Sequence, residues 1–157
     1  MDPFVLKPRE IHVFYTQVED VKDSHLLKEY RSAISEKEKA KVDRYMFEKD
    51  QHTCLVTRVL SRYLLSLCTR KPYQQFDFFE NEYGKPDLKK GLVDLPVKFS
   101  LSHSSSLTAC ALTLENDIGL DVEDYRRKID LNISDRYFAP SEAACVKESP
   151  KKSGLKT

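Results

Sequence analysis

Two kinds of segment are missing from this sequence. No apolar run approaches the roughly 20 residues that a membrane-spanning helix needs, so a membrane protein is not expected. The N-terminus, MDPFVLKPRE, lacks the basic segment, apolar core and small-residue cleavage site of a secretory signal. These two absences favour a cytoplasmic location.

Cysteine and net charge are also low. The four cysteines, Cys54, Cys68, Cys110 and Cys145, show no CxxC spacing, and three of them lie in apolar surroundings. A reduced thiol there behaves as a small core side chain, so neither a zinc site nor a disulfide framework is indicated. A net charge of +1 argues against bulk nucleic-acid binding, which rests on a strongly basic surface. Any basic site must be local.

The length and periodicity predict one α+β domain. A chain of 157 residues with 40% hydrophobic and 32% charged residues is long enough for one domain with its own core. Alternating apolar residues predict strands, and apolar residues three and four apart predict helices. We expect strands at 10–18, 75–79, 97–103, 107–114 and 118–123, and helices at 21–34, 35–47, 51–69, 131–138 and 140–148. The polar end, 149–157, is expected to be a flexible tail.

Two carboxylates mark the last predicted strand. In Ile118-Gly119-Leu120-Asp121-Val122-Glu123, Asp121 and Glu123 share a face, about 6 to 7 Å apart. Ionised carboxylates this close repel each other and are best explained by a shared cation or a basic partner. Hard oxygen ligands suit Mg²⁺. The simpler alternative is a solvated strand face.

A histidine stands at the exit of another predicted strand. Val97, Phe99, Leu101 and His103 alternate with polar residues, and the strand then delivers Ser102, His103 and Ser104 to a short loop. A rigid strand can aim a binding residue while the following loop leaves it accessible. A purely structural histidine is the alternative.

Basic residues occur on two predicted helices. Ser35 and Glu38 match a capping box, so a helix should start there; on it Lys37, Lys41 and Arg44 share a face. The next helix is expected to be capped by Asp50 and to carry a wide apolar stripe, with Arg58 and Arg62 one turn apart on its polar side. Taken alone, the first set is typical of a solvated surface; Arg58 and Arg62 could be surface charges or could lie near a phosphate or adenine group.

The order of these motifs resembles a known family. Tyr83-Gly84-Lys85-Pro86 reads as a turn that presents a lysine, and FSLSHS, IGLDVE, RYF and Glu142 follow it. The set is similar to the larger, surfactin-synthetase-activating type of 4'-phosphopantetheinyl transferase, over roughly residues 35–142. The resemblance implies one pseudo-repeat of that fold plus the start of the second: a small antiparallel sheet packed on a long helix.

The resemblance also implies site residues. Asp121 and Glu123 would hold Mg²⁺, and with His103 they form the expected catalytic set. Coenzyme A, the substrate, would be bound by Lys41, Arg44, Arg62, Lys85, Ser102 and His103, with the helix carrying Lys41 at the 3'-phosphate. The family has a lysine where this sequence has Glu38, so that contact is not expected here.

The sequence departs from the family in its second half. It has no tryptophan, whereas the family's second half carries a Trp-x-x-Lys-Glu-Ala-type helix. Lys147-Glu148 is interpreted as a chance match because Ser-Pro follows it. The chain is therefore expected to be a truncated member with weak turnover, and exposed apolar surface at the missing interface makes a homo-oligomer plausible.

Three functional hypotheses remain at this stage. The first is an Mg²⁺-dependent enzyme that transfers the 4'-phosphopantetheine arm of coenzyme A to a serine of an apo acyl or peptidyl carrier protein. The second is a non-catalytic module that binds coenzyme A or a carrier protein. The third is a small helical regulator unrelated to coenzyme A. None of them requires nucleic acid or a membrane.

Overall fold

The computed structural model describes residues 3–82, 84–89, 91–124 and 133–148. The chain divides into two compact units, 1–124 and 125–157. The expected tail, 149–157, lies outside the described residues. None of the described helices is both long and apolar enough to cross a membrane.

An antiparallel sheet forms the centre of the first unit. Its strand order is β1-β5-β4, and a separate two-stranded hairpin joins β2 to β3. The strands are β1 (His12–Gln17), β2 (Phe78–Glu80), β3 (Pro86–Leu88), β4 (Val97–His103) and β5 (Leu107–Leu114). The bounds of β4 and β5 confirm the two strands predicted at 97–103 and 107–114, the first from its alternation and the second from its apolar run. In their register Phe99 lies opposite Leu112 and His103 opposite Thr108.

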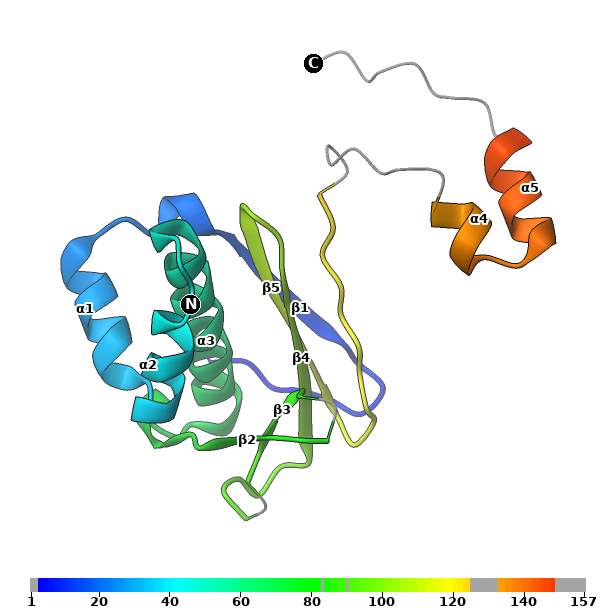
Figure 1. Cartoon of the computed structure of the whole chain (residues 1–157). Helices are drawn as coiled ribbons and strands as arrows, with labels where there is room; N and C mark the ends of the chain where they lie inside the picture. The colour runs from blue at the N-terminus through cyan, green and yellow to red at the C-terminus, as the bar shows by residue number, and fades with distance from the viewer. Residues whose placement is uncertain (1–2, 83, 90, 125–132, 149–157) are drawn as a thin grey trace. The chain divides into compact units, whose positions relative to one another are not determined.

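Helices cover one face of this sheet. Figure 1 shows α3 between the sheet and the helices α1 and α2. The helical segments are α1 (Ser24–Ala33), α2 (Glu36–Asp43), α3 (Glu48–Thr69) and two 3-10 turns, η1 (Val18–Asp20) and η2 (Tyr73–Gln75). The small antiparallel sheet on a 22-residue helix confirms the predicted α+β class.

Local side chains set the helix starts, with one correction. Asp23 accepts a hydrogen bond from the Leu26 amide at 2.8 Å and begins α1. The capping box of Ser35 and Glu38 is present, as predicted. The predicted cap at Asp50 is wrong: α2 ends at Asp43 rather than near residue 47, and α3 begins at Glu48. Asp50 lies in the first turn of α3, where its negative charge interacts favourably with the positive end of the helix dipole.

The core lies between α3 and the sheet. Leu64, Leu65 and Cys68 of α3 belong to the same buried cluster as Phe99 and Leu112 of the sheet. A second cluster, Ile34, Val42, Cys54, Leu55 and Val59, joins the three helices. Burial raises the pKa of the Cys68 thiol to about 11. It also raises the pKa of Cys110 to about 12, as expected for cysteines that serve as core residues.

Two apolar residues of β1 point away from the core. Phe14 turns toward the core, whereas Val13 and Tyr15 on the other side are 53% and 70% exposed. Because successive strand residues point to opposite faces, one register places all of one set outside. Pairing of β1 with β5 then decides which set that is.

The predicted strand at 118–123 is not formed. This segment runs along β4 on the side away from α3, and serine hydroxyls hold it where a backbone ladder would. The amide of Leu120 donates to Ser100 Oγ at 3.1 Å and that of Val122 to Ser102 Oγ at 3.0 Å. The predicted alternation is nevertheless present: Leu120 and Val122 are half-buried, and Asp121 and Glu123 are exposed.

The second unit contains two short helices, α4 (Ile133–Tyr137) and α5 (Pro140–Glu148). Helix α5 begins at Pro140, the first residue of the helix predicted at 140–148. Proline suits this first position since it has no amide hydrogen to leave unpaired. The Glu142 carboxylate accepts a hydrogen bond from the Ala139 amide at 2.9 Å and so stabilises the helix start.

Candidate functional site

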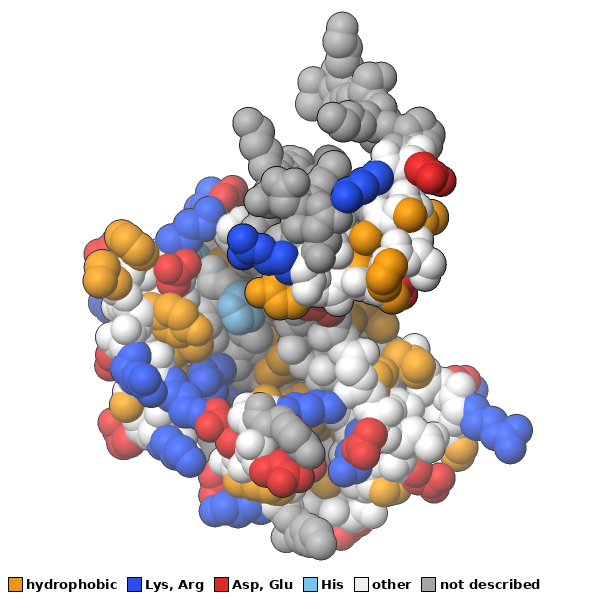
Figure 2. Space-filling view, turned by 45° about the vertical axis from the view of Figure 1, so that its right-hand side comes forward, with side chains coloured by type: hydrophobic (Ala, Val, Ile, Leu, Met, Phe, Trp, Pro, Cys, Tyr) orange, Lys and Arg blue, Asp and Glu red, His pale blue; other side chains and the backbone are white. Residues whose placement is uncertain are grey.

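Basic side chains from α2 and α3 line a cavity of about 390 Å³. Lys41 lies in the last turn of α2, Arg44 and Tyr45 follow in the connection to α3, and Arg58 reaches in from α3. None of the described residues lining this cavity carries a carboxylate. Figure 2 shows Lys and Arg side chains gathered close together on part of the face drawn there. The cavity therefore offers concentrated positive charge, which suits an anion such as phosphate.

The electrostatics of Lys41 reflect this crowding. Partial burial, followed by the charges of Arg58, Lys37 and Arg44, lowers the pKa of the Lys41 ammonium group from its usual range. Its ion pair with Glu80 of β2 offsets only part of this repulsion. The Nε atom of Arg58 is buried and has no hydrogen-bond partner among the described residues. A bound anion would relieve the repulsion.

A smaller cavity of about 130 Å³ shares two of these cations. Lys41 and Arg58 line it together with Lys37 and residues of the β2–β3 hairpin. Of the three cations predicted to share a face, Lys37 lines the smaller cavity, Arg44 the larger one and Lys41 both. The carboxylates of Glu38, Asp77 and Glu80 also line the smaller cavity. We call the cations Lys37, Lys41, Arg44 and Arg58 of the two adjoining cavities the basic region.

Arg62 does not lie on an exposed polar side, which corrects the sequence-based interpretation. Its side chain is 1% exposed, and its guanidinium pairs with the buried carboxylate of Glu38. It also donates to the backbone oxygens of Phe76 at 2.6 Å and Tyr73 at 3.2 Å, and it lies 4.9 Å from the ring centre of Phe78. Arg62 thereby ties α2, α3 and the hairpin together beneath the basic region.

Glu38 serves as the anionic centre of this arrangement. Burial alone would raise the pKa of its carboxyl, but the hydrogen bonds from Ser35 and the positive charge of Arg62 outweigh that effect and lower the pKa below its usual range. The Arg58 guanidinium lies 3.6 Å from the other Glu38 oxygen. Glu38 is therefore a structural partner of both arginines.

The carboxylates Asp121 and Glu123 lie on the exposed side of the segment at 118–123, which follows β5 in the chain and runs along β4. Asp121 Oδ1 accepts a hydrogen bond from Ser102 Oγ at 3.1 Å, and no described residue forms an ion pair with either carboxylate. The alternative of a shared basic partner is therefore not seen among the described residues. The pair remains open to a cation.

Ser102 and His103 occupy the end of β4. Ser102 is committed to the segment beside it, since its hydroxyl donates to Asp121 and accepts from the Val122 amide. The exposed ring of His103 lies next to it at the last residue of the strand. The strand thus places a histidine and the anchored Asp121 near the same end of β4.

Lys85 comes from the hairpin and reaches the same segment. Its ammonium group donates to the Ile118 backbone oxygen at 2.5 Å. The turn before it is closed by a 2.9 Å hydrogen bond from the Gly84 amide to the Asn81 oxygen, and Gly84 adopts φ of +77°, which favours glycine. Tyr83, within the predicted turn, lies outside the described residues.

Contacts therefore join most of the predicted residues into two neighbouring groups. Lys41 and Arg44 belong to the basic region, while Lys85, Ser102 and Asp121 meet along the segment at 118–123. The hairpin connects the groups, because Lys41 pairs with Glu80 on one of its strands and Lys85 precedes the other. Within 3–82, 84–89, 91–124 and 133–148, no group of three His, Cys, Asp or Glu side chains is close enough to hold a metal ion.

The sequence pattern did not distinguish the role of Arg58 from that of Arg62. Both follow the same helical side one turn apart, so periodicity assigns them the same role. The sequence contained one weak indication that Arg62 is paired. Glu38 has the opposite charge and belongs to a capping box that holds it at the start of α2.

Comparison of folds gives the first step of the classification. The structure resembles a holo-(acyl-carrier-protein) synthase from Bacillus anthracis, solved in complex with CoA (3',5'-ADP), with a TM-score of 0.50 and 13% identity. The match covers 66% of this chain and 93% of that protein. At this identity the similarity establishes the fold.

Sequence comparison gives the second step. Residues 22–115 match the family described as 4'-phosphopantetheinyl transferase, N-terminal. The chain is 29% identical to the 4'-phosphopantetheinyl transferase gsp of Aneurinibacillus migulanus over 84% of its length, and 32% identical to Sfp of Bacillus subtilis over 72%. This chain belongs to the 4'-phosphopantetheinyl transferase family. It spans about half the length of these relatives, 53% of gsp and 48% of Sfp.

Proposed function

We propose that this chain provides the coenzyme A-binding part of an enzyme that transfers the 4'-phosphopantetheine arm to a serine of a carrier protein. The observation that carries the proposal is the basic cavity, where Lys41, Arg44 and Arg58 converge without a lining carboxylate. Coenzyme A carries a 3'-phosphate and a pyrophosphate, and such groups favour several charge-assisted hydrogen bonds. Membership of the family supports the same assignment.

Each predicted residue receives a role in this proposal. Lys41 and Arg44, joined by Arg58, bind the 3'-phosphate; Lys85 lies at the adenosine end, and His103 contacts the other phosphates. Ser102 has its hydroxyl engaged with Asp121 and the Val122 amide, so it acts by positioning Asp121. Arg62 does not contact the coenzyme, because it is buried and its terminal nitrogens donate to Glu38 and two backbone oxygens. It acts by positioning α2 and the hairpin.

Asp121 and Glu123 suit Mg²⁺ in this arrangement. Magnesium commonly uses one or two protein carboxylates and takes its other ligands from water and substrate phosphates, so two exposed carboxylates without a cationic partner fit it. When bound, the metal would neutralise charge that develops on the pyrophosphate. Ser102 orients Asp121 through its hydroxyl and thereby holds the first of these carboxylates in place.

The reaction breaks the pyrophosphate linkage of coenzyme A and forms a phosphate ester. The carrier-protein serine oxygen bonds to the phosphorus next to the pantetheine arm, the P–O bond to the departing 3',5'-ADP breaks, and a carboxylate base takes the proton of the serine hydroxyl. Cations around the phosphates contribute by stabilising charge that grows in the transition state. His103, the exposed residue at the end of β4, is the candidate for direct contact with the reacting phosphate.

The proposal includes the setting of the reaction. The partner is an apo acyl or peptidyl carrier protein, the compartment is the cytoplasm, and assembly into a homo-oligomer is possible through exposed apolar residues such as Val13 and Tyr15. Neither nucleic acid nor a membrane takes part.

Calorimetric titration tests the binding half of the proposal. Coenzyme A should bind more tightly than dephospho-coenzyme A, and Lys41→Ala should weaken coenzyme A binding roughly tenfold or more while affecting the dephospho form less. Lys39→Ala is the matched control, because Lys39 lies on the same helix and pairs with Glu36. Equal binding of the two coenzymes by the parent chain would place the phosphate site elsewhere.

Mass spectrometry tests the transfer half. An apo carrier protein incubated with coenzyme A, Mg²⁺ and this chain should gain the phosphopantetheine arm, and Asp121→Ala should reduce the gain. Binding of coenzyme A without any gain would favour the non-catalytic binding module.

A further inference from the structure

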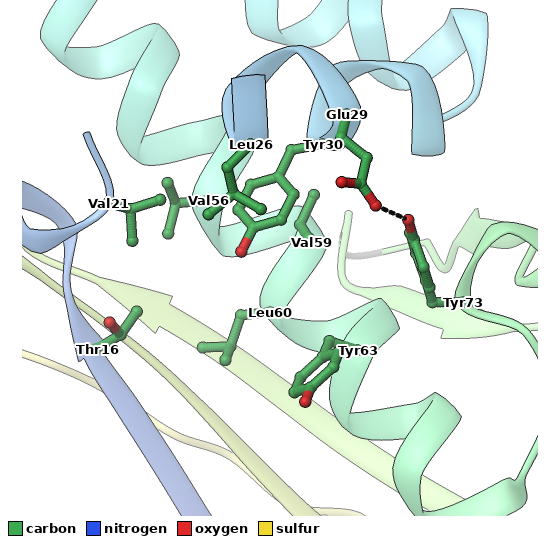
Figure 3. A pocket seen from close by; sticks show the side chains of 10 residues that line it. All are labelled: Thr16, Val21, Leu26, Glu29, Tyr30, Val56, Val59, Leu60, Tyr63 and Tyr73. Carbon is green, nitrogen blue, oxygen red and sulfur yellow. Dashed lines mark hydrogen bonds between the residues drawn. The ribbon is translucent and has the colours of Figure 1, made fainter. Parts of the chain in front are cut away.

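A third cavity, separate from the two at the basic region, lies on the opposite side of α3. Its volume is about 450 Å³, and none of its lining residues belongs to either basic cavity. It is lined by Thr16, Val21, Leu26, Glu29, Tyr30, Val56, Val59, Leu60, Tyr63 and Tyr73. These come from β1, the following connection, α1, α3 and η2 (Figure 3).

The walls of this cavity are mostly apolar. Val56, Val59 and Leu60 form the side on α3, and Val21 and Leu26 lie across from them. A cavity of this size and lining removes water from the apolar stem of a small ligand, and a few polar groups then set its orientation.

The polar groups all favour a positive charge. Glu29 is the single charged residue among the described residues that line the cavity, and three phenols accompany it. The Tyr73 hydroxyl donates to one Glu29 oxygen at 2.8 Å. Figure 3 shows the other oxygen directed toward Tyr30, and no described residue donates a hydrogen bond to it.

The Glu29 carboxylate affects the pKa values of two of these phenols. Burial, followed by the charge of Glu29 and the proximity of Tyr63, raises the pKa of Tyr30. The hydrogen bond to Glu29 raises the pKa of Tyr73. Both shifts mean that a negative charge on these phenols is disfavoured, and the Glu29 carboxylate contributes to both. The negative charge of Glu29 itself attracts a cation. Tyrosine ring faces attract cations as well.

We propose that this cavity binds a small organic ammonium compound with an apolar stem. The ammonium group occupies the space beside the unpaired Glu29 oxygen and Tyr30, and the stem lies against Val56, Val59 and Leu60. Such a site is separate from the coenzyme site and does not depend on it, because the two share no residue.

Two isosteric probes test the proposal. 4-Phenylbutylamine is cationic at neutral pH, whereas 4-phenylbutanol has nearly the same shape without the charge. Titration of each into the full chain, followed by NMR shifts, should show the amine binding about fivefold more tightly or better. The largest shifts should occur at the amides of residues that line the cavity. Equal binding of the two probes would overturn the proposal.

Variants of acidic residues locate the charge that recognises the amine. Glu29→Gln should reduce binding of the amine to the level of the alcohol, and Glu36→Gln, an exposed control on α2, should leave the preference intact. A preference that survives Glu29→Gln would contradict the assignment. Salt supplies a second measurement on the unaltered protein: because Glu29 is exposed, raised ionic strength should narrow the difference between the probes. A salt-independent difference would likewise contradict it.

Discussion

Two regions of this protein carry carboxylates in opposite circumstances. Glu38 is buried between α2 and α3, where it accepts from Ser35 and pairs with Arg62. Asp121 and Glu123 stand exposed on a segment that has no ladder of its own and that serine hydroxyls hold against β4. The first carboxylate has all of its charge compensated within the protein, while the other two have none of theirs compensated by a described cation.

This difference separates a structural role from a binding role. Removing one partner from a buried ion pair leaves a charge in a poorly solvated environment, which is costly. An exposed carboxylate is already solvated, so its removal costs the fold little and changes mainly what the protein can bind. The position of a carboxylate near a sequence motif does not tell a structural role from a binding role. Its burial and its hydrogen-bond and ion-pair partners do.

The largest expected effect is the loss of Arg62. Arg62→Met leaves the Glu38 carboxylate buried without its closest cation, so we expect the free energy of unfolding to fall by about 3 to 5 kcal/mol. Chemical denaturation measures it. Arg31→Met is the control, since Arg31 forms an exposed pair with Asp43 at 2.7 Å and should cost about 0 to 1 kcal/mol. Equal effects of the two substitutions would remove the proposed distinction.

Glu38→Gln should show a smaller effect that depends on pH. At neutral pH it replaces charge-assisted hydrogen bonds by neutral ones, for an expected cost of about 1.5 to 3 kcal/mol. The folded-state pKa of Glu38 is lowered, so its stabilising contribution is present above the unfolded-state pKa and is lost as the pH falls through the folded-state value. Parent and variant stabilities, measured by denaturation across acidic pH, should therefore converge below the usual glutamate range. A constant difference would contradict the shift.

Ser102→Ala tests the attachment of the carboxylate segment. The hydroxyl donates to Asp121 and accepts from the Val122 amide, so its loss should cost about 1 kcal/mol. Hydrogen exchange of the Val122 amide should accelerate more than that of the β5 amides. Ser105→Ala, in the loop after β4, is the control. Unchanged exchange at Val122 would show that the hydroxyl does not hold the segment.

The smallest effect on stability is expected at the exposed carboxylates. Asp121→Ala and Glu123→Ala should each change the free energy of unfolding by about 0.5 kcal/mol or less, yet abolish any tightening of coenzyme A binding by Mg²⁺. Calorimetry with and without Mg²⁺ measures the second quantity. A large loss of stability without any metal effect in the parent would instead assign Asp121 to a structural interaction.

Local patterns in the sequence were sufficient for much of the fold. The alternation in β4, the apolar run of β5, the capping box at Ser35 and the alternating burial at 118–123 could each be read from a few neighbouring residues. The order of YGKP, FSLSHS and IGLDVE also identified the family that the comparisons show. The order of motifs along the chain can be read without knowing how the segments pack.

Only the tertiary structure decided the roles of residues with equivalent local patterns. Arg58 and Arg62 occupy the same side of α3, yet the hairpin and η2 cover Arg62 and leave Arg58 at the cavity. The segment at 118–123 has the pattern of a strand, yet the hydroxyls of Ser100 and Ser102 take its amides in place of a ladder. In both cases the outcome depends on a partner distant in sequence, and short-range periodicity contains no information about which partner arrives.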